Sequence, residues 1–167
     1  MCQHNILLVD DSINILRSLE RILKLEGYTI LTAQSGPEAI AVLSTKDIDL
    51  LITDENMPGM SGTDLLKTVC DMYPQVVRIM LTGASDIEVA KKAINSGEIY
   101  KFFTKPWDDF ELLVSVKYAL KLKQLEKENV KLKSVIKGQE NLLNKLEKEY
   151  PGISKKKLTA DGSIIID

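Results

Sequence analysis

Apolar runs alternate with helically periodic segments over most of the chain. Five runs of mainly aliphatic and aromatic side chains end in polar or turn-forming residues, and they cover 5–10, 28–33, 48–53, 76–81 and 99–104. A short apolar run bounded by turn residues indicates a buried strand. The segments between the runs repeat apolar side chains every three or four positions, which predicts helices near 12–25, 35–43, 61–72 and 85–97.

This alternation predicts an α/β fold with helices on both faces of a sheet, because strands joined through helices run parallel with right-handed crossovers. The carboxyl ends of parallel strands share one edge of the sheet, and that edge is where ligands bind. The first run ends there at Asp10 and Asp11, and the third ends at Asp54. The fourth ends at Thr82 and the fifth at Lys105.

Three carboxylates, a hydroxyl and an ammonium group are therefore expected to meet at one place. Grouped carboxylates avoid mutual repulsion by binding a divalent cation, and an all-oxygen set suits Mg²⁺ or Mn²⁺. The cation and the lysine would neutralise the oxygens of a phosphoryl group, the hydroxyl would donate to it, and an aspartate would act as the nucleophile. The strand ends thus predict a site for a phosphoryl group bound to a carboxylate.

Four short motifs contain these residues, and their order and spacing resemble the receiver domain of two-component response regulators. The motifs read LLVDDS, ITDENMPG, MLTGAS and FFTKPW, and the resemblance covers roughly residues 4–120. It implies a flavodoxin-like, five-stranded parallel sheet in the order 2-1-3-4-5, which places the first and third strands side by side at the switch point.

The resemblance also implies roles for single residues. Asp54 would accept a phosphoryl group from a partner sensor histidine kinase. Mg²⁺ would be held by Asp11, Asp54 and the backbone carbonyl of Asn56, with Asp10 acting through water. Lys105 would contact the phosphoryl oxygens after a cis peptide bond to Pro106.

Two further residues would report the modification. Thr82 would follow the phosphoryl group, and Phe102, three residues before Lys105, takes the place of the switch aromatic. Phenylalanine has no hydroxyl, so an inward position would depend on packing alone, and a plain core role is the alternative for Phe102. Thr82 and Phe102 would shift the face formed by the fourth helix, the fifth strand and the fifth helix.

From Trp107 onward the pattern predicts one long helix, starting at Asp108 or Asp109 and ending at Tyr150, about 43 residues later. Its apolar residues fall seven apart, which indicates a coiled coil, and Asn129 within the seam favours a parallel homodimer, whereas Val135 and Leu142 beside the seam leave a four-helix assembly open. Two heptad positions form the seam: one holds Tyr118, Leu125, Leu132, Gln139 and Leu146, and the other holds Leu122, Asn129, Ile136, Leu143 and Tyr150.

The predicted organisation has three parts. They are a receiver domain at 1–117, a coiled-coil helix at 118–150 continuous with the fifth helix, and a tail at 151–167 with a possible hairpin at Asp161-Gly162.

Composition adds only broad limits. The 167 residues carry a net charge of −2, which favours neither nucleic acid nor an anionic membrane as a partner. Neither a run of about 18 apolar residues nor a signal-peptide pattern is visible, so a cytoplasmic protein is predicted.

The sequence leaves four interpretations of function open, one of which is a purely structural coiled-coil module whose receiver is inactive. The first is a phosphoacceptor without enzymatic turnover that acts on a downstream protein partner. The second is the receiver part of a longer regulator, because KFFTKPW resembles receivers that precede HD-type cyclic-dinucleotide phosphodiesterases and residues 151–167 are too few for an output domain. The third is a phosphohydrolase with an aspartyl nucleophile, which would want an aspartate where Asn56 stands.

Overall fold

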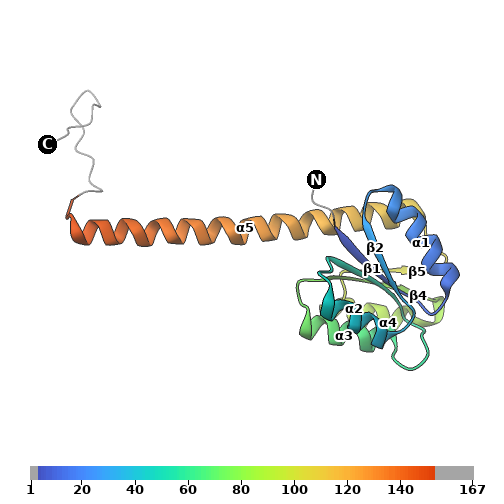
Figure 1. The fold of residues 1–167 in the computed structure, drawn as a ribbon. Coiled ribbons are helices and arrows are strands. Elements are labelled where there is room, and N and C mark those ends of the chain that lie inside the picture. Colours follow the sequence, from blue (N-terminus) through green and yellow to red (C-terminus); the bar gives the residue numbers. More distant parts are fainter. Residues whose placement is uncertain (1–3, 153–167) are drawn as a thin grey trace. The chain divides into compact units, whose positions relative to one another are not determined.

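Five parallel strands form one sheet in the order β2-β1-β3-β4-β5, as predicted. The computed structural model describes residues 4–152 (Figure 1). The strands are β1 (Asn5–Val9), β2 (Thr29–Ala33), β3 (Leu50–Asp54), β4 (Val77–Thr82) and β5 (Lys101–Thr104). β1 and β3 are neighbours at the centre of the sheet, so the acids that follow or end them lie at the same edge.

Helices follow the strands in sequence. They are α1 (Ile13–Leu25), α2 (Gly36–Thr45), α3 (Gly62–Met72), α4 (Ile87–Asn95), which follows a single turn η1 (Ala84–Asp86), and α5 (Asp109–Glu149). Two strands extend one residue further than predicted, so Asp54 and Thr82 are the last residues of β3 and β4 rather than the first loop residues. Their backbones are therefore fixed by the sheet.

Each face of the sheet is covered by its own group of helices (Figure 1). Helices α1 and α5 cover one face, where Leu19 and Val116 are buried against strand residues such as Ile52. Helices α2, α3 and α4 cover the other face, where Leu66 and Ala90 belong to a second buried cluster. Apolar side chains point to both faces of β1 and β3, which explains why these strands read as unbroken apolar runs.

Helix α5 contains 41 residues and belongs to two compact units, residues 1–123 and 124–167. In the first unit, its residues Leu112, Val116, Ala119 and Leu120 are buried. In the second unit, the apolar residues of the heptad positions are exposed on the single chain, for example Leu132 at 63% and Ile136 at 54%. The coiled coil stays a prediction, and the hairpin predicted near Asp161-Gly162 lies outside the described residues. Within residues 4–152, none of the helices combines the length and apolar character needed to cross a bilayer.

Candidate functional site

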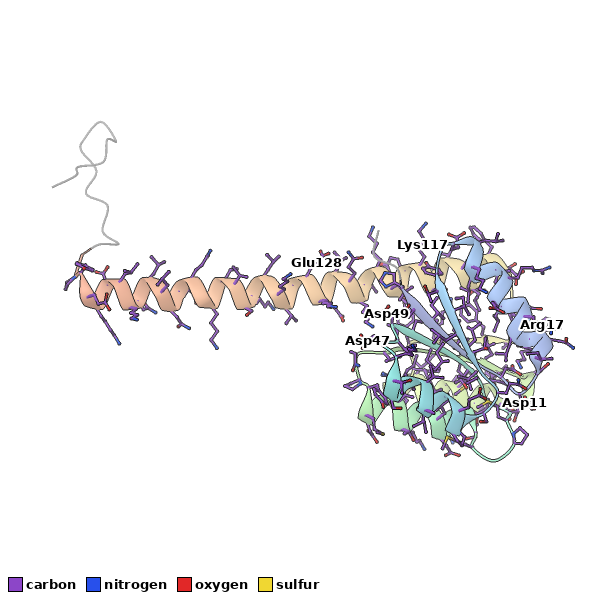
Figure 2. All side chains as sticks on the ribbon, viewed as in Figure 1. Asp11, Arg17, Asp47, Asp49, Lys117 and Glu128 are labelled. Carbon is purple, nitrogen blue, oxygen red and sulfur yellow. The ribbon has the colours of Figure 1, made fainter. Side chains whose placement is uncertain are left out.

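The carboxylates of Asp10, Asp11 and Asp54 meet at the carboxyl edge of the sheet. Strand pairing aligns Val9 with Thr53, so the next residues, Asp10 and Asp54, stand side by side. One oxygen from each of the three acids lies within 4.8 Å of the others. Asp10 and Asp54 are buried, whereas Asp11 is exposed. Figure 2 shows Asp11 at this end of the sheet and Asp49 at the opposite end.

Lys105 joins the cluster from the end of β5. Its Nζ lies 2.9 Å from Oδ1 of Asp54 and 3.0 Å from Oδ2 of Asp10. The Lys105–Pro106 peptide bond is cis, as the resemblance implied. The backbone N–H of Lys105 donates to the carbonyl of Thr82 at 2.8 Å, which holds the end of β5 against β4. The structure thus brings the predicted amine onto the predicted carboxylates.

The donor set fits a divalent cation. Oxygens bound to one Mg²⁺ lie about 3–4 Å apart, close to the separation of the three acids. Asp10 already uses both oxygens, since Oδ1 accepts from the backbone N–H of Ser12 at 2.8 Å and Oδ2 accepts from Lys105. For the Asp11 carboxylate, the structure records no hydrogen bond or ion pair within residues 4–152. Asp11 is therefore better placed than Asp10 to bind a cation directly.

The electrostatics of the site favour a cation and disfavour an extra negative charge. Burial raises the pKa of Asp54, and the nearby Asp10 carboxylate acts in the same direction, while Lys105 opposes both. Burial alone would lower the pKa of Lys105, but its hydrogen bonds and charge interactions with Asp54 and Asp10 prevail and raise it. Lys105 is therefore a permanent cation at neutral pH, and the ionised Asp54 is held at a cost.

The substitution Asp54→Asn is expected to stabilise the metal-free fold at neutral pH by about 1 kcal/mol. Because the pKa of Asp54 is raised in the folded state, its favourable contribution is complete below the ordinary carboxyl pKa and is lost as the pH rises through the raised value. Urea unfolding of both proteins in chelator, at neutral pH and toward about pH 4, measures this difference. A stability gain that stays constant with pH would contradict the stated cause.

Thr82 and Phe102 lie on neighbouring strands next to the site. Thr82 is fully buried, and its hydroxyl donates to the backbone carbonyl of Gly83 at 3.3 Å. Phe102 pairs with Met80 across β4 and β5 and packs, partly buried, against the cluster beneath α2, α3 and α4. In the described structure Thr82 therefore bonds to its own loop, and Phe102 fills space at the core margin.

The loop between β3 and α3 is held by contacts that the sequence analysis missed. The buried carboxylate of Glu55 accepts from both the backbone N–H and the hydroxyl of Thr63, each at 2.8 Å. The backbone N–H of Gly62 donates to the carbonyl of Glu55 at 3.0 Å, and the Asn56 side chain donates to Asp86 at 2.8 Å. A glycine in the first turn of a helix was an available signal for Gly62, since glycine is a poor helix former. Asp86 gave no signal, because its partner lies 30 residues away.

Gly62 permits this close packing, and Gly62→Ala is expected to lower the free energy of unfolding by about 2–3 kcal/mol. A Cβ at this position would overlap the backbone carbonyl of Asp54 and lie 2.8 Å from Cα of Glu55. Neither backbone can move without displacing the end of β3. Chemical denaturation measures the loss, and Gly138→Ala is the matched control because a Cβ there meets open space. Equal effects at the two glycines would contradict this account.

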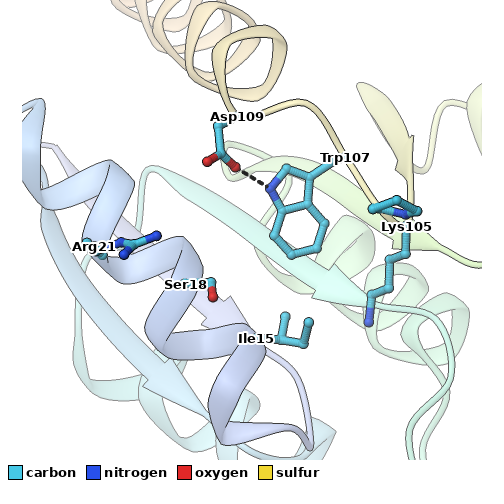
Figure 3. A pocket seen from close by; sticks show the side chains of 7 residues that line it. Ile15, Ser18, Arg21, Lys105, Trp107 and Asp109 are labelled. Atoms are coloured by element: carbon cyan, nitrogen blue, oxygen red, sulfur yellow. Dashed lines mark hydrogen bonds between the residues drawn. The ribbon is translucent and has the colours of Figure 1, made fainter.

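A cavity of about 500 Å³ opens beside Lys105 (Figure 3). It lies between α1 and the segment after β5, and its walls include the Trp107 ring, the Ile15 side chain and the cation of Arg21. Trp107 is fixed by a hydrogen bond from its indole N–H to Asp109 at 3.0 Å. The cavity therefore gives access from solvent to the side of the site that Lys105 occupies.

An open parallel sheet with three acids at its switch point and a lysine from the last strand defines a receiver-type protein. The chain belongs to the response regulator receiver domain family, whose family model matches residues 6–117. This agrees with the class that the four motifs predicted.

The relatives of the chain are regulators and receiver domains. The chain is 33% identical over 124 residues to the hydrogenase transcriptional regulatory protein HoxA of Cupriavidus necator, covering 74% of the chain but only 26% of that protein. Among solved structures, the signal receiver domain of an HD domain-containing protein from Pseudomonas fluorescens Pf-5 is 39% identical with a TM-score of 0.71, over 77% of this chain and 94% of that one. A structure described as adenylate cyclase from Rhodopirellula baltica is 31% identical with a TM-score of 0.75, over 80% of this chain and 98% of that one.

Proposed function

We propose that Asp54 accepts a phosphoryl group from a phosphohistidine of a partner sensor kinase. The observation that carries this proposal is the buried Asp54 carboxylate, which lies 2.9 Å from Lys105 within a group of acids that fits a divalent cation. Asp54 attacks the phosphorus in line, and the phosphorus–nitrogen bond to the donor histidine breaks, which leaves an acyl phosphate. A bound Mg²⁺, held by Asp11, Asp54 and the backbone carbonyl of Asn56, would supply charge neutralisation of the transferred oxygens.

Lys105 and Thr82 support the modified state from two sides. The Lys105 ammonium, already at the carboxylate, neutralises part of the roughly two negative charges that arrive. The Thr82 hydroxyl leaves the Gly83 carbonyl and donates to a phosphoryl oxygen instead. This movement, with repacking of Phe102, alters the face formed by α4, β5 and α5.

A phosphoacceptor is favoured over a phosphohydrolase by the residue two positions after Asp54. Rapid turnover would need an acid or base there, but the residue is Asn56, and its amide is engaged by Asp86. An amide neither takes nor gives a proton at neutral pH, so water attack on the acyl phosphate lacks this help. The chain therefore acts as a carrier of the signal rather than as a catalyst with many turnovers.

The signal is proposed to leave through helix α5. Residues 1–117 form the receiver domain, and residues 118–150 form a parallel coiled coil with a second copy of the chain. One helix contains both the buried Val116 and the exposed heptad residues Leu132 and Ile136, so a change at the receiver can alter the dimer. Because the chain spans 26% of the length of HoxA, the output is proposed to be either a further domain, of the transcriptional or HD type, or a separate downstream protein.

Incubation with acetyl phosphate and Mg²⁺ tests the proposal directly. Intact mass measurement is expected to show the gain of one phosphoryl group per chain, which chelator prevents and hydroxylamine removes, as expected for an acyl phosphate. The alternative is tested with p-nitrophenyl phosphate, for which no sustained turnover is expected. Steady turnover without a stable mass gain would overturn the phosphoacceptor function and favour the hydrolase.

A further inference from the structure

A side-chain hydrogen bond joins the two loops that flank the site. The loop after β3 contributes Asn56, whose Nδ2 donates to Oδ2 of Asp86 at 2.8 Å. The loop after β4 contributes Asp86, and the same carboxylate oxygen also accepts from the hydroxyl of Ser85 at 2.9 Å. Asn56 stands two residues after Asp54, and Asp86 four residues after Thr82. The Asn56–Asp86 bond, called the interloop bond below, therefore connects the strand end that holds the nucleophile to the loop that follows the switch hydroxyl.

A second set of contacts holds the loop after β4 in the same arrangement. The Gly83 carbonyl accepts from the Thr82 hydroxyl at 3.3 Å and from the backbone N–H of Asp86 at 3.1 Å. The acceptors of this loop thus engage two donors that stand next to Asp54, the hydroxyl of Thr82 and the amide of Asn56. Both donors are uncharged, and each can turn toward a different acceptor.

A phosphoryl group on Asp54 would compete for these donors. It brings about two negative charges and three strong acceptor oxygens to a partly enclosed site. Asp86 is half-buried, and its bond to Asn56 lies at the surface, where water can replace a departing donor. An ionised acid in water loses little when one donor leaves, whereas acceptors in a partly enclosed site gain more from the same donor. The contacts seen here therefore belong to the unmodified domain.

We infer that Asp86 is a positioning residue that holds the loop after β4 in its unmodified arrangement by engaging Asn56, and that the modified state forms as the interloop bond breaks. This inference rests on the proposed function and adds a residue to its regulation. Removing the Asp86 carboxylate takes away a contact made only in the unmodified state. Without this contact the unmodified arrangement is less stable relative to the modified one. By thermodynamic linkage, a ligand that binds the modified arrangement then binds more tightly.

The test uses BeF₃⁻ with Mg²⁺, a stable stand-in for the phosphoryl group, and measures its affinity by titration calorimetry. Asp86→Ala is expected to bind BeF₃⁻ about fivefold more tightly than the wild type, the change that a typical net contribution of one surface hydrogen bond supplies. Glu88→Ala is the matched control, since it removes an acid two residues away, one that is more exposed than Asp86 and whose partner is Lys91. The control is expected to leave the affinity within about twofold, because a screened exposed charge acts weakly.

A double-mutant cycle separates the bond from the charge of Asp86. In an Asn56→Ala background, which keeps the backbone carbonyl, Asp86→Ala is expected to cause no further tightening. Equal tightening in both backgrounds would overturn the inference, because Asp86 would then act by its charge alone. No tightening in the wild-type background would overturn it as well.

The Asn56 side-chain amide resonances are expected to shift in Asp86→Ala but not in Glu88→Ala, and unchanged resonances would likewise count against the interloop bond.

The proposed function fails in a different and recognisable way. If the wild-type protein binds no BeF₃⁻ in the presence of Mg²⁺, the site does not hold an acyl phosphate, and the inference falls with it. If the wild type binds but the Asp86 variants behave as the wild type does, the phosphoacceptor function stands and only the role of Asp86 is wrong.

Discussion

Phosphoryl uptake from acetyl phosphate is expected to fall at least about a thousandfold in Asp54→Asn, which corresponds to about 4 kcal/mol of lost transition-state stabilisation. The substitution keeps the size and shape of the side chain but replaces the nucleophilic oxygen by an amide. Asp10 is not expected to take over, because its carboxylate is almost completely buried and both oxygens already accept hydrogen bonds, from Ser12 and Lys105. Asp11 is exposed and lacks a contact with Lys105, whose cation would neutralise the oxygens of the arriving phosphoryl group. Mass measurement of the phosphorylated fraction over time provides the rate.

Two further variants show whether the loss is specific. Asp71→Asn, on the exposed surface of α3, is expected to take up phosphoryl at the wild-type rate. Asp11→Asn is expected to raise the Mg²⁺ concentration needed for half-maximal uptake, while the rate at saturating Mg²⁺ changes less. Uptake by Asp54→Asn at a rate close to that of the wild type would mean that another residue accepts the group, and the site assignment would then be wrong.

The sheet and the group of acids at its edge could be predicted because both follow from local patterns. Buried strands appear in the sequence as apolar runs. Once the strands are parallel, the residues at their carboxyl ends must lie along one edge of the sheet. Asp54 and Asp10 were therefore predictable at the same edge of the sheet before any distance was known. The order of the strands came from the resemblance of the four motifs rather than from the runs themselves, since periodicity alone does not decide which strands pair.

The contacts between loops could not be predicted in the same way. The sequence analysis assigned no role to Glu55, yet its carboxylate is buried and accepts two hydrogen bonds from Thr63 at the start of α3. Asp86 precedes α4, but its side chain makes no capping bond and accepts from Asn56 instead. Such pairs depend on the exact course of two loops, and neither composition nor spacing specifies that course. The residues that tune the site are therefore less predictable than those that form it.

The predicted coiled coil depends on apolar positions that lack partners in the single chain. Leu125, Leu132, Ile136 and Leu143 are each more than half exposed, although they follow the heptad repeat. Exposure of this kind, sustained along one helix, is unfavourable unless a second helix covers it. In a parallel dimer, Lys121 would meet Glu126 of the second copy and Glu128 would meet Lys133, and both pairs are attractive.

Ile136→Asp is expected to weaken the dimer at least about a thousandfold and to leave a monomer at micromolar concentration. Two isoleucines lose about 2–3 kcal/mol each of buried apolar surface, and two carboxylates would face each other in the seam. Ser134→Asp is the matched control, because this position lies on the outer face of the predicted coil and adds the same charge. Sedimentation velocity of both variants and the wild type measures the assembly. A monomeric wild type, or a dimer that Ile136→Asp leaves intact, would show that the exposed heptad positions do not form a dimer seam. A change at Asp54 would then have to act on a surface other than the coiled coil of α5.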